Sequence, residues 1–125
     1  MTNRIVICGT RDFNDAQLLY STIDALIKNA ESSEIVTGGC RGADKIGECY
    51  AQNNNIPLKV FPADWGKYGR AAGPIRNKQM LDYALKEKAT VIAFWDGKSR
   101  GTLNMINIAK KSKADVYVIK YGDIE

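Results

Sequence analysis

The residues best suited to chemistry in this sequence are arginines that lie close to glycines. Five of the six arginines occur in glycine-containing segments, whereas the twelve lysines are scattered along the chain. Glycine lets a backbone approach a ligand closely, and the arginine fork binds two oxygens of a phosphate. The segments are 9–11, 37–44, 69–77 and 96–102. Together they predict a site for an anion such as phosphate.

Groups for acid–base chemistry are few. Histidine is absent, which excludes His-containing catalytic triads and two-histidine zinc helices. Asp44 and Asp96 lie among the glycines, where each could contact a ribose or serve in catalysis. Aspartate is also a favoured residue at the start of a helix, so both interpretations stay open.

The three cysteines give no sign of a metal site or a disulfide framework, because their number is odd and none lie close together. We therefore expect no metal and no cofactor. Cys40 is a weak candidate nucleophile, since no histidine is present to act as its base. Cys8 and Cys49 are interpreted as small buried apolar residues.

Two aromatic side chains, Trp65 and Tyr68, fall in a long connection over residues 62–73. Either could stack on a nucleobase, and either could instead pin the connection to the surface. The lysine at position 98 lies between Gly97 and Ser99, as in a Walker A loop. Ile92 stands where that motif requires glycine, so no P-loop is expected.

The elements that must position these residues follow from hydrophobic periodicity. Short β-branched runs predict strands at 5–8, 34–37, 58–61, 90–95 and 115–119. Apolar residues with helical spacing predict four helices, around 19–27, 43–51, 80–85 and 105–109. The alternation indicates one α/β domain over residues 1–125 with a mostly parallel five-stranded sheet. Ligands of such sheets bind beyond the carboxyl ends of the strands, where the glycine–arginine segments fall.

Charge and hydropathy indicate the class of ligand and the cellular location. The net charge of +4 and the pI near 9.0 are mildly basic, which suits an anionic ligand and falls short of a nucleic-acid-binding pattern. The apolar run at 5–8 is too short for a signal peptide, and no later run predicts a membrane span. We expect a cytoplasmic protein that has no membrane partner, and nucleic acid ranks last among its candidate ligands.

Four motifs in order resemble the YspA, cpYpsA-related branch of the SLOG superfamily. They are Gly9-x-Arg11-x-Phe13-x-Asp15, the run TGGCRGAD at 37–44, Ala72-Gly73-Pro74-x-Arg76-Asn77-x-x-Met80, and the segment 93–102. The resemblance implies a Rossmann-like three-layer sandwich related to the LOG proteins and to DprA. It also implies binding of a nucleotide or a nucleotide-derived signal of the ADP-ribose or NAD type, in sensing or sequestration, in systems of phage–bacterium conflict.

One departure from the LOG pattern bears on catalysis. LOG enzymes cleave the N-glycosidic bond of nucleotides with the motif P-G-G-x-G-T-x-x-E. Gly101 and Thr102 match its G-T pair, but its glutamate falls on Met105. The resemblance assigns Arg76 to the LOG arginine, so Arg76, Asp96 and Asp44 are the catalytic candidates if the protein is an enzyme. Loss of the carboxylate favours binding over cleavage.

Our leading prediction is thus a binding module, with a phosphoribohydrolase-like enzyme and a DprA-like single-stranded DNA binder as alternatives. Assembly into a homo-oligomer stays open. The predicted ligand-binding residues are Gly9, Thr10, Arg11, Thr37, Gly38, Gly39, Arg41, Gly42, Asp44, Trp65, Tyr68, Arg76, Asn77, Asp96, Gly97, Lys98, Ser99, Arg100, Gly101 and Thr102.

Overall fold

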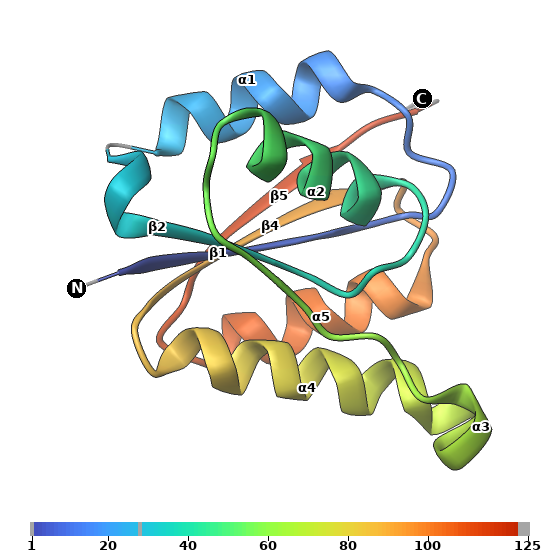
Figure 1. Cartoon of the computed structure of the whole chain (residues 1–125). Helices are drawn as coiled ribbons and strands as arrows, with labels where there is room; N and C mark the ends of the chain where they lie inside the picture. The colour runs from blue at the N-terminus through green and yellow to red at the C-terminus, as the bar shows by residue number, and fades with distance from the viewer. Residues whose placement is uncertain (1, 28, 123–125) are drawn as a thin grey trace.

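The computed structural model describes residues 2–27 and 29–122, and its centre is a five-stranded sheet (Figure 1). The strands are β1 (Asn3–Gly9), β2 (Ser33–Thr37), β3 (Leu58–Val60), β4 (Lys88–Trp95) and β5 (Asp115–Lys120). Their order in the sheet is β3-β2-β1-β4-β5, and every neighbouring pair is parallel. The predicted α/β class is confirmed, and the sheet is entirely rather than mostly parallel.

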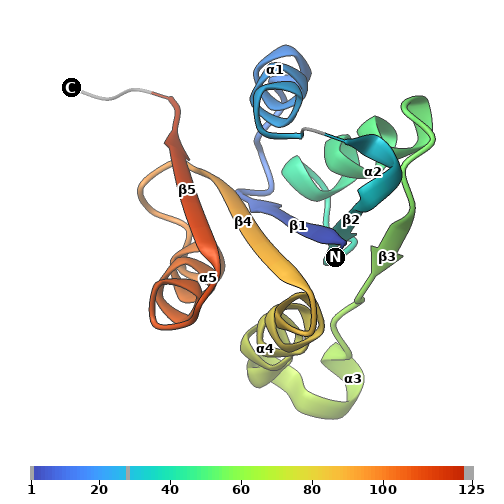
Figure 2. The ribbon, with the colours of Figure 1, turned by 90° about the vertical axis from the view of Figure 1, so that its left-hand side faces the viewer.

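Helices cover both faces of the sheet, which gives the three layers of a Rossmann-like sandwich (Figure 2). The long helices are α1 (Ala16–Leu26), α2 (Ala43–Asn53), α4 (Ala72–Leu85) and α5 (Arg100–Lys110). Helices α1 and α2 lie on one face, and α4 and α5 lie on the other. The remaining helical segments are short: α3 (Trp65–Tyr68) and the 3₁₀ turns η1 (Ala30–Ser32) and η2 (Gly69–Ala71).

The side-chain alternation of the strands builds two cores. Along β1, Ile5 and Ile7 point towards α1 and α2, whereas Val6 and Cys8 point towards α4 and α5. The central strands carry apolar residues on both faces, as expected for a parallel sheet that is covered on both sides. This packing fixes the strand ends and therefore the loops that follow them.

The connection over 62–73 differs from the prediction of a long loop. Residues 65–68 form α3, and α4 already begins at Ala72. Pro74 is the third residue of α4, where a backbone N–H has no acceptor within the helix, so proline is tolerated there. Glycine and proline are typical of loops, so the sequence pattern did not predict that α4 begins before Gly73 and Pro74.

The predictions for two of the cysteines have different outcomes. Cys8 is buried as expected, but Cys49 is exposed, so the prediction for Cys49 was wrong. Its position on α2 is opposite to the face that buries Ala43, Gly47 and Tyr50.

Within residues 2–27 and 29–122, no helix combines the length and the apolar character that a membrane crossing requires.

Candidate functional site

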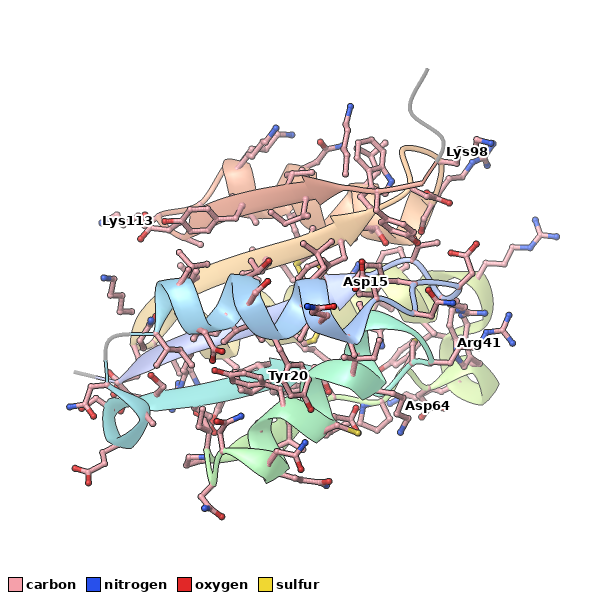
Figure 3. All side chains as sticks on the ribbon, turned by 90° about the horizontal axis from the view of Figure 1, so that it is seen from above. Asp15, Tyr20, Arg41, Asp64, Lys98 and Lys113 are labelled. Carbon is pink, nitrogen blue, oxygen red and sulfur yellow. The ribbon has the colours of Figure 1, made fainter. Side chains whose placement is uncertain are left out.

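A small cavity lies beyond the carboxyl ends of β1 and β4, where the strand order reverses. Such a reversal is where ligands bind in open α/β sheets. We call it the inner cavity; its volume is about 110 Å³. It is lined by Cys8, Gly9, Arg11, Cys40, Asp44, Trp65, Gly73, Arg76, Asn77, Met80, Ser99, Gly101 and Thr102. Figure 3 shows Arg41 and Lys98 at this end of the molecule and Lys113 at the other.

Arg76 is the buried cation of the inner cavity, with 9% of its surface exposed. Its Nη1 donates to the carbonyl of Gly38 at 2.7 Å, and the Sγ of Cys40 lies 3.6 Å from the same nitrogen. Among the described residues, no carboxylate oxygen lies within 4.0 Å of its guanidinium. A buried charge is normally paired, so Arg76 stands out as a cation without a direct ion pair, although its charge reaches the Asp44 carboxyl group in the same cavity.

Gly38 explains how the guanidinium reaches this place. A Cβ atom added to Gly38 would collide with Nη1 of Arg76 and would lie 2.7 Å from its Cζ. The absence of a side chain at 38 therefore makes room for Arg76 rather than for a ligand. Gly42 acts similarly, because a Cβ there would lie 2.5 Å from the carbonyl oxygen of Thr10, and its φ of 87° also disfavours other residues.

Asn77 links Arg76 to the start of α5. Its Oδ1 accepts from Nε of Arg76 at 3.2 Å, and its Nδ2 donates to the carbonyl of Gly101 and to Oδ1 of Asn104. Asn77 is buried, with 5% of its surface exposed. One amide thus connects the guanidinium with the helix that follows β4.

Asp44 brings a buried carboxyl group into the same cavity. Its Oδ2 accepts from the backbone N–H groups of Gly38 at 2.9 Å and Cys40 at 3.3 Å, so it fixes the loop after β2. Desolvation by burial raises the pKa of Asp44 to about 6, although these hydrogen bonds and the charge of Arg76 act in the opposite direction. Asp44 does not cap α2, because the N-cap residue is Gly42.

A broader, shallower depression of about 580 Å³ adjoins the inner cavity, and we call it the outer groove. The two share Arg11, Trp65, Gly73, Ser99 and Gly101. The further lining residues of the groove are Thr10, Arg70, Pro74, Asp96, Lys98, Arg100 and Asn104. Four cationic side chains therefore line the groove, and Asp96 is its one carboxylate among the described residues.

Asp96 has a local structural role. Its Oδ1 accepts from the backbone N–H groups of Lys98 and Ser99, and these hydrogen bonds lower its pKa. Ser99 caps α5 through a hydrogen bond from the N–H of Thr102. Asp96 and Ser99 thus shape the turn that leads into α5.

The two aromatic candidates separate in space. Trp65 is half exposed, at 49%, lines both the cavity and the groove, and has the Arg11 guanidinium 5.9 Å from its ring centroid. Tyr68 lies on another depression, which Arg76 also borders, and it lines neither the inner cavity nor the outer groove. Of the two, Trp65 is placed to contact a molecule in the cavity.

Comparisons with known proteins identify the family of this chain. The "Gene 61 protein" of Mycobacterium phage D29 is 32% identical over 127 residues, which cover 96% of this chain and 97% of that protein. The family model of the YspA, cpYpsA-related SLOG family matches residues 3–68. The chain belongs to this SLOG family. No solved structure gives a significant match.

The SLOG fold brings together thirteen of the twenty predicted residues. The inner cavity contains Gly9, Arg11, Asp44, Trp65, Arg76, Asn77, Ser99, Gly101 and Thr102, and the outer groove adds Thr10, Asp96, Lys98 and Arg100. The other seven line neither space: Thr37, Gly38, Gly39, Arg41, Gly42, Tyr68 and Gly97. Arg76 and Asn77 lie in α4 rather than in a loop.

Two kinds of residue that line this candidate site were not predicted from the sequence. Asn104 was not selected, although it follows Gly101 by three positions on one helix and therefore lies on the same face. Met80 and Gly73 line the cavity as parts of α4, whose first turns were taken for a loop. Met105, the residue that the resemblance to LOG proteins aligns with their glutamate, is fully buried in the core beside α4. No cluster of three metal-ligand side chains is found in the described part of the chain.

Proposed function

We propose that this protein binds a nucleotide or a nucleotide-derived signal through a phosphate group in the inner cavity. The observation that carries the proposal is Arg76, a buried guanidinium with no carboxylate within 4.0 Å in the described structure. A charged group buried without a counterion is costly, and an anionic ligand removes that cost. The guanidinium fork suits phosphate oxygens.

The surroundings of Arg76 support a nucleotide over a simple anion. The inner cavity has the scale of a phosphate or a ribose phosphate, and the outer groove offers space for the rest of the molecule. Trp65 stands where the two meet and presents an exposed ring for a base. Arg11, Arg70, Lys98 and Arg100 favour a second phosphate, as in ADP-ribose or NAD derivatives.

The proposed role is to hold the ligand, in sensing or sequestration. Met105 is buried where LOG enzymes carry a glutamate, so α5 supplies no carboxylate at that position. A relative encoded by a phage fits a part in phage–bacterium conflict.

The proposal is tested first by mass spectrometry of small molecules released from natively purified protein, and then by calorimetry with AMP, ADP-ribose and NAD. Arg76→Gln removes the buried charge, so we expect its affinity to fall about 10- to 100-fold. Lys113→Gln removes an equal charge at the opposite end and should bind as the wild type does. Equal losses in both variants, or no binding by the wild-type protein, would contradict the proposal.

A second candidate function rests on Asp44. A buried carboxyl group with a pKa of about 6 is suited to donate a proton near neutral pH. In this scheme water attacks the anomeric carbon of a nucleotide, the N-glycosidic bond breaks, and Asp44 protonates the departing base. The attacking water then returns a proton to Asp44.

Chromatography of AMP incubated with excess protein distinguishes cleavage from binding. Release of adenine that is lost in Asp44→Asn would establish the enzyme, whereas intact AMP with retained binding supports the binding module. Steep salt dependence of binding to a single-stranded oligonucleotide would point instead to nucleic acid.

A further inference from the structure

Within α4, the side chain that accepts a hydrogen bond from Arg76 is the amide of Asn77 and not a carboxylate. Asn77 Oδ1 accepts from Arg76 Nε at 3.2 Å, and both side chains are more than nine-tenths buried. An aspartate has the same shape and would form an ion pair at this distance. Such a pair would satisfy the guanidinium internally and leave the inner cavity without its buried positive charge, with only the Arg11 side chain at its border with the outer groove.

The remaining hydrogen bonds of Asn77 show that its amide orientation is determined. Nδ2 donates to the carbonyl of Gly101 at 3.1 Å and to Oδ1 of Asn104 at 2.9 Å. Both acceptors need an N–H donor, so Oδ1 must face Arg76. The amide is therefore fully engaged within the protein and has no donor left for a ligand.

We infer that Asn77 is a positioning residue that orients the guanidinium of Arg76 while leaving its charge available to an anionic ligand. The inference rests on the proposed function and changes the role predicted for Asn77, from a ligand contact to a residue that acts through Arg76. The carbonyl of Gly101, which can only accept, fixes the direction of the amide, and Asn104 supplies a second acceptor.

Cys40 offers a readout of this charge that requires no ligand. Its Sγ lies 3.6 Å from Nη1 and 3.7 Å from Nη2 of Arg76, and the half-buried thiol lines the inner cavity. Iodoacetate is an anion and iodoacetamide is its neutral analogue of similar size. The ratio of the iodoacetate rate to the iodoacetamide rate at one sulfur therefore reports the local charge. Any change in the ionisation of the thiol alters both rates by the same factor and leaves this ratio unchanged.

The experiment compares this ratio in the wild type, Asn77→Asp and Asn107→Asp, with the modified peptides separated by mass spectrometry. Asn107 is exposed on α5 and lines neither the cavity nor the groove, so its variant adds the same charge elsewhere. We expect Asn77→Asp to lower the ratio at Cys40 about fivefold or more, because a charge within a few ångströms of the sulfur is neutralised. The ratio should stay unchanged in Asn107→Asp, and at the exposed Cys49 of every protein.

A second arm measures AMP affinity by calorimetry. Asn77→Asp should weaken binding at least tenfold, and Asn107→Asp should bind within twofold of the wild type. Asn77→Ala keeps the charge of Arg76 but not its orientation, so we expect an unchanged alkylation ratio and an affinity about three- to tenfold lower. This variant tests the positioning role even if Asn77→Asp does not fold.

Together, the alkylation and calorimetry experiments distinguish failure of the proposed function from failure of the inference about Asn77. Wild-type protein that binds none of AMP, ADP-ribose and NAD, with the expected alkylation ratios, would contradict the proposed function and leave the arrangement of Asn77 and Arg76 established. An unchanged ratio in folded Asn77→Asp would overturn the inference, as would full AMP affinity in Asn77→Ala.

Discussion

Single residues around Arg76 depend on one another more than the sequence suggests. Gly38 was predicted as a ligand contact, but its missing side chain makes room for the Arg76 guanidinium. Asp44 was predicted to contact a ribose, to catalyse or to cap a helix, and its carboxylate binds the backbone of the loop after β2. Residue types and spacing could indicate which positions matter. They could not show which of these positions contact other parts of the protein, because those partners are distant in sequence.

Gly38→Ala tests the close approach of Arg76. The added methyl group forces the guanidinium aside, and we expect a destabilisation of about 2 kcal/mol together with about tenfold weaker AMP binding. Gly101→Ala is the comparison for stability, because nothing lies within 4 Å of a Cβ at that helical position. Alanine should stabilise α5 there by up to about 1 kcal/mol. Urea denaturation measures both effects, and equal destabilisation by the two changes would refute the explanation.

Asp44→Asn tests the cost of the buried carboxyl group. Its pKa is 3.8 in the unfolded chain and about 6 in the folded protein, so the folded state retains a proton that the unfolded state releases between these values. Stability therefore falls as the pH rises from about 4 to about 6, by an amount on the order of 3 kcal/mol, and changes no further above that. The asparagine variant lacks this loss, so its stability relative to that of the wild type should rise across the same pH range. Urea denaturation at pH 4, 5, 6 and 7.5 measures the difference, and parallel curves would contradict it.

Among the elements, the strands were the most predictable from sequence. All five lie where β-branched runs predicted them. The central strands β1, β2 and β4 are buried, nearly continuous apolar segments, whereas the edge strands β3 and β5 are partly exposed and were found from their β-branched residues. The segment from Pro62 to Gly73 was the least predictable. Glycine and proline there read as loop, whereas the structure forms α3, η2 and the first turn of α4. Proline is compatible with a first helical turn, and tertiary contacts decide between the two interpretations.

Helix α3 projects from the body of the protein beside α4 (Figure 1). Its Trp65 faces the inner cavity and is half exposed, so the ring contributes little to the core. We expect Trp65→Ala to weaken AMP binding about 5- to 50-fold through lost base stacking, with little change in melting temperature. Tyr68→Ala removes a ring from the same helix but from a different depression, and it should bind AMP within twofold of the wild type. Fluorescence titration or calorimetry measures both, and similar losses in the two variants would argue against stacking on Trp65.

At the scale of the whole molecule, one end of the sheet carries the proposed site and the other end contributes to stability. At the end opposite the cavity, Glu34 accepts from Nε of Arg4 at 2.9 Å and from the hydroxyl of Tyr83. This network joins β1, β2 and α4, and its ion pair is largely shielded from solvent. It holds the sheet to α4 far from the proposed site.

Glu34→Gln should therefore reduce stability and leave binding intact. We expect a loss of about 2 kcal/mol in the free energy of unfolding, because two hydrogen bonds to a charged group are weakened. The dissociation constant for AMP should stay within twofold of the wild-type value. Urea denaturation and calorimetry on one preparation test the separation, which a large change in affinity would disprove.

The strand order also bears on how the chain is made. β1 lies at the centre of the sheet, and one of its edges pairs with β4, so that Asn3 lies opposite Lys88. A growing chain has to leave that edge unpaired while the intervening residues are synthesised, which takes roughly 4 to 17 seconds at typical rates. An unpaired strand edge with apolar faces is a template for aggregation. The nascent polypeptide on the ribosome therefore exposes a strand edge that the finished protein covers with β4.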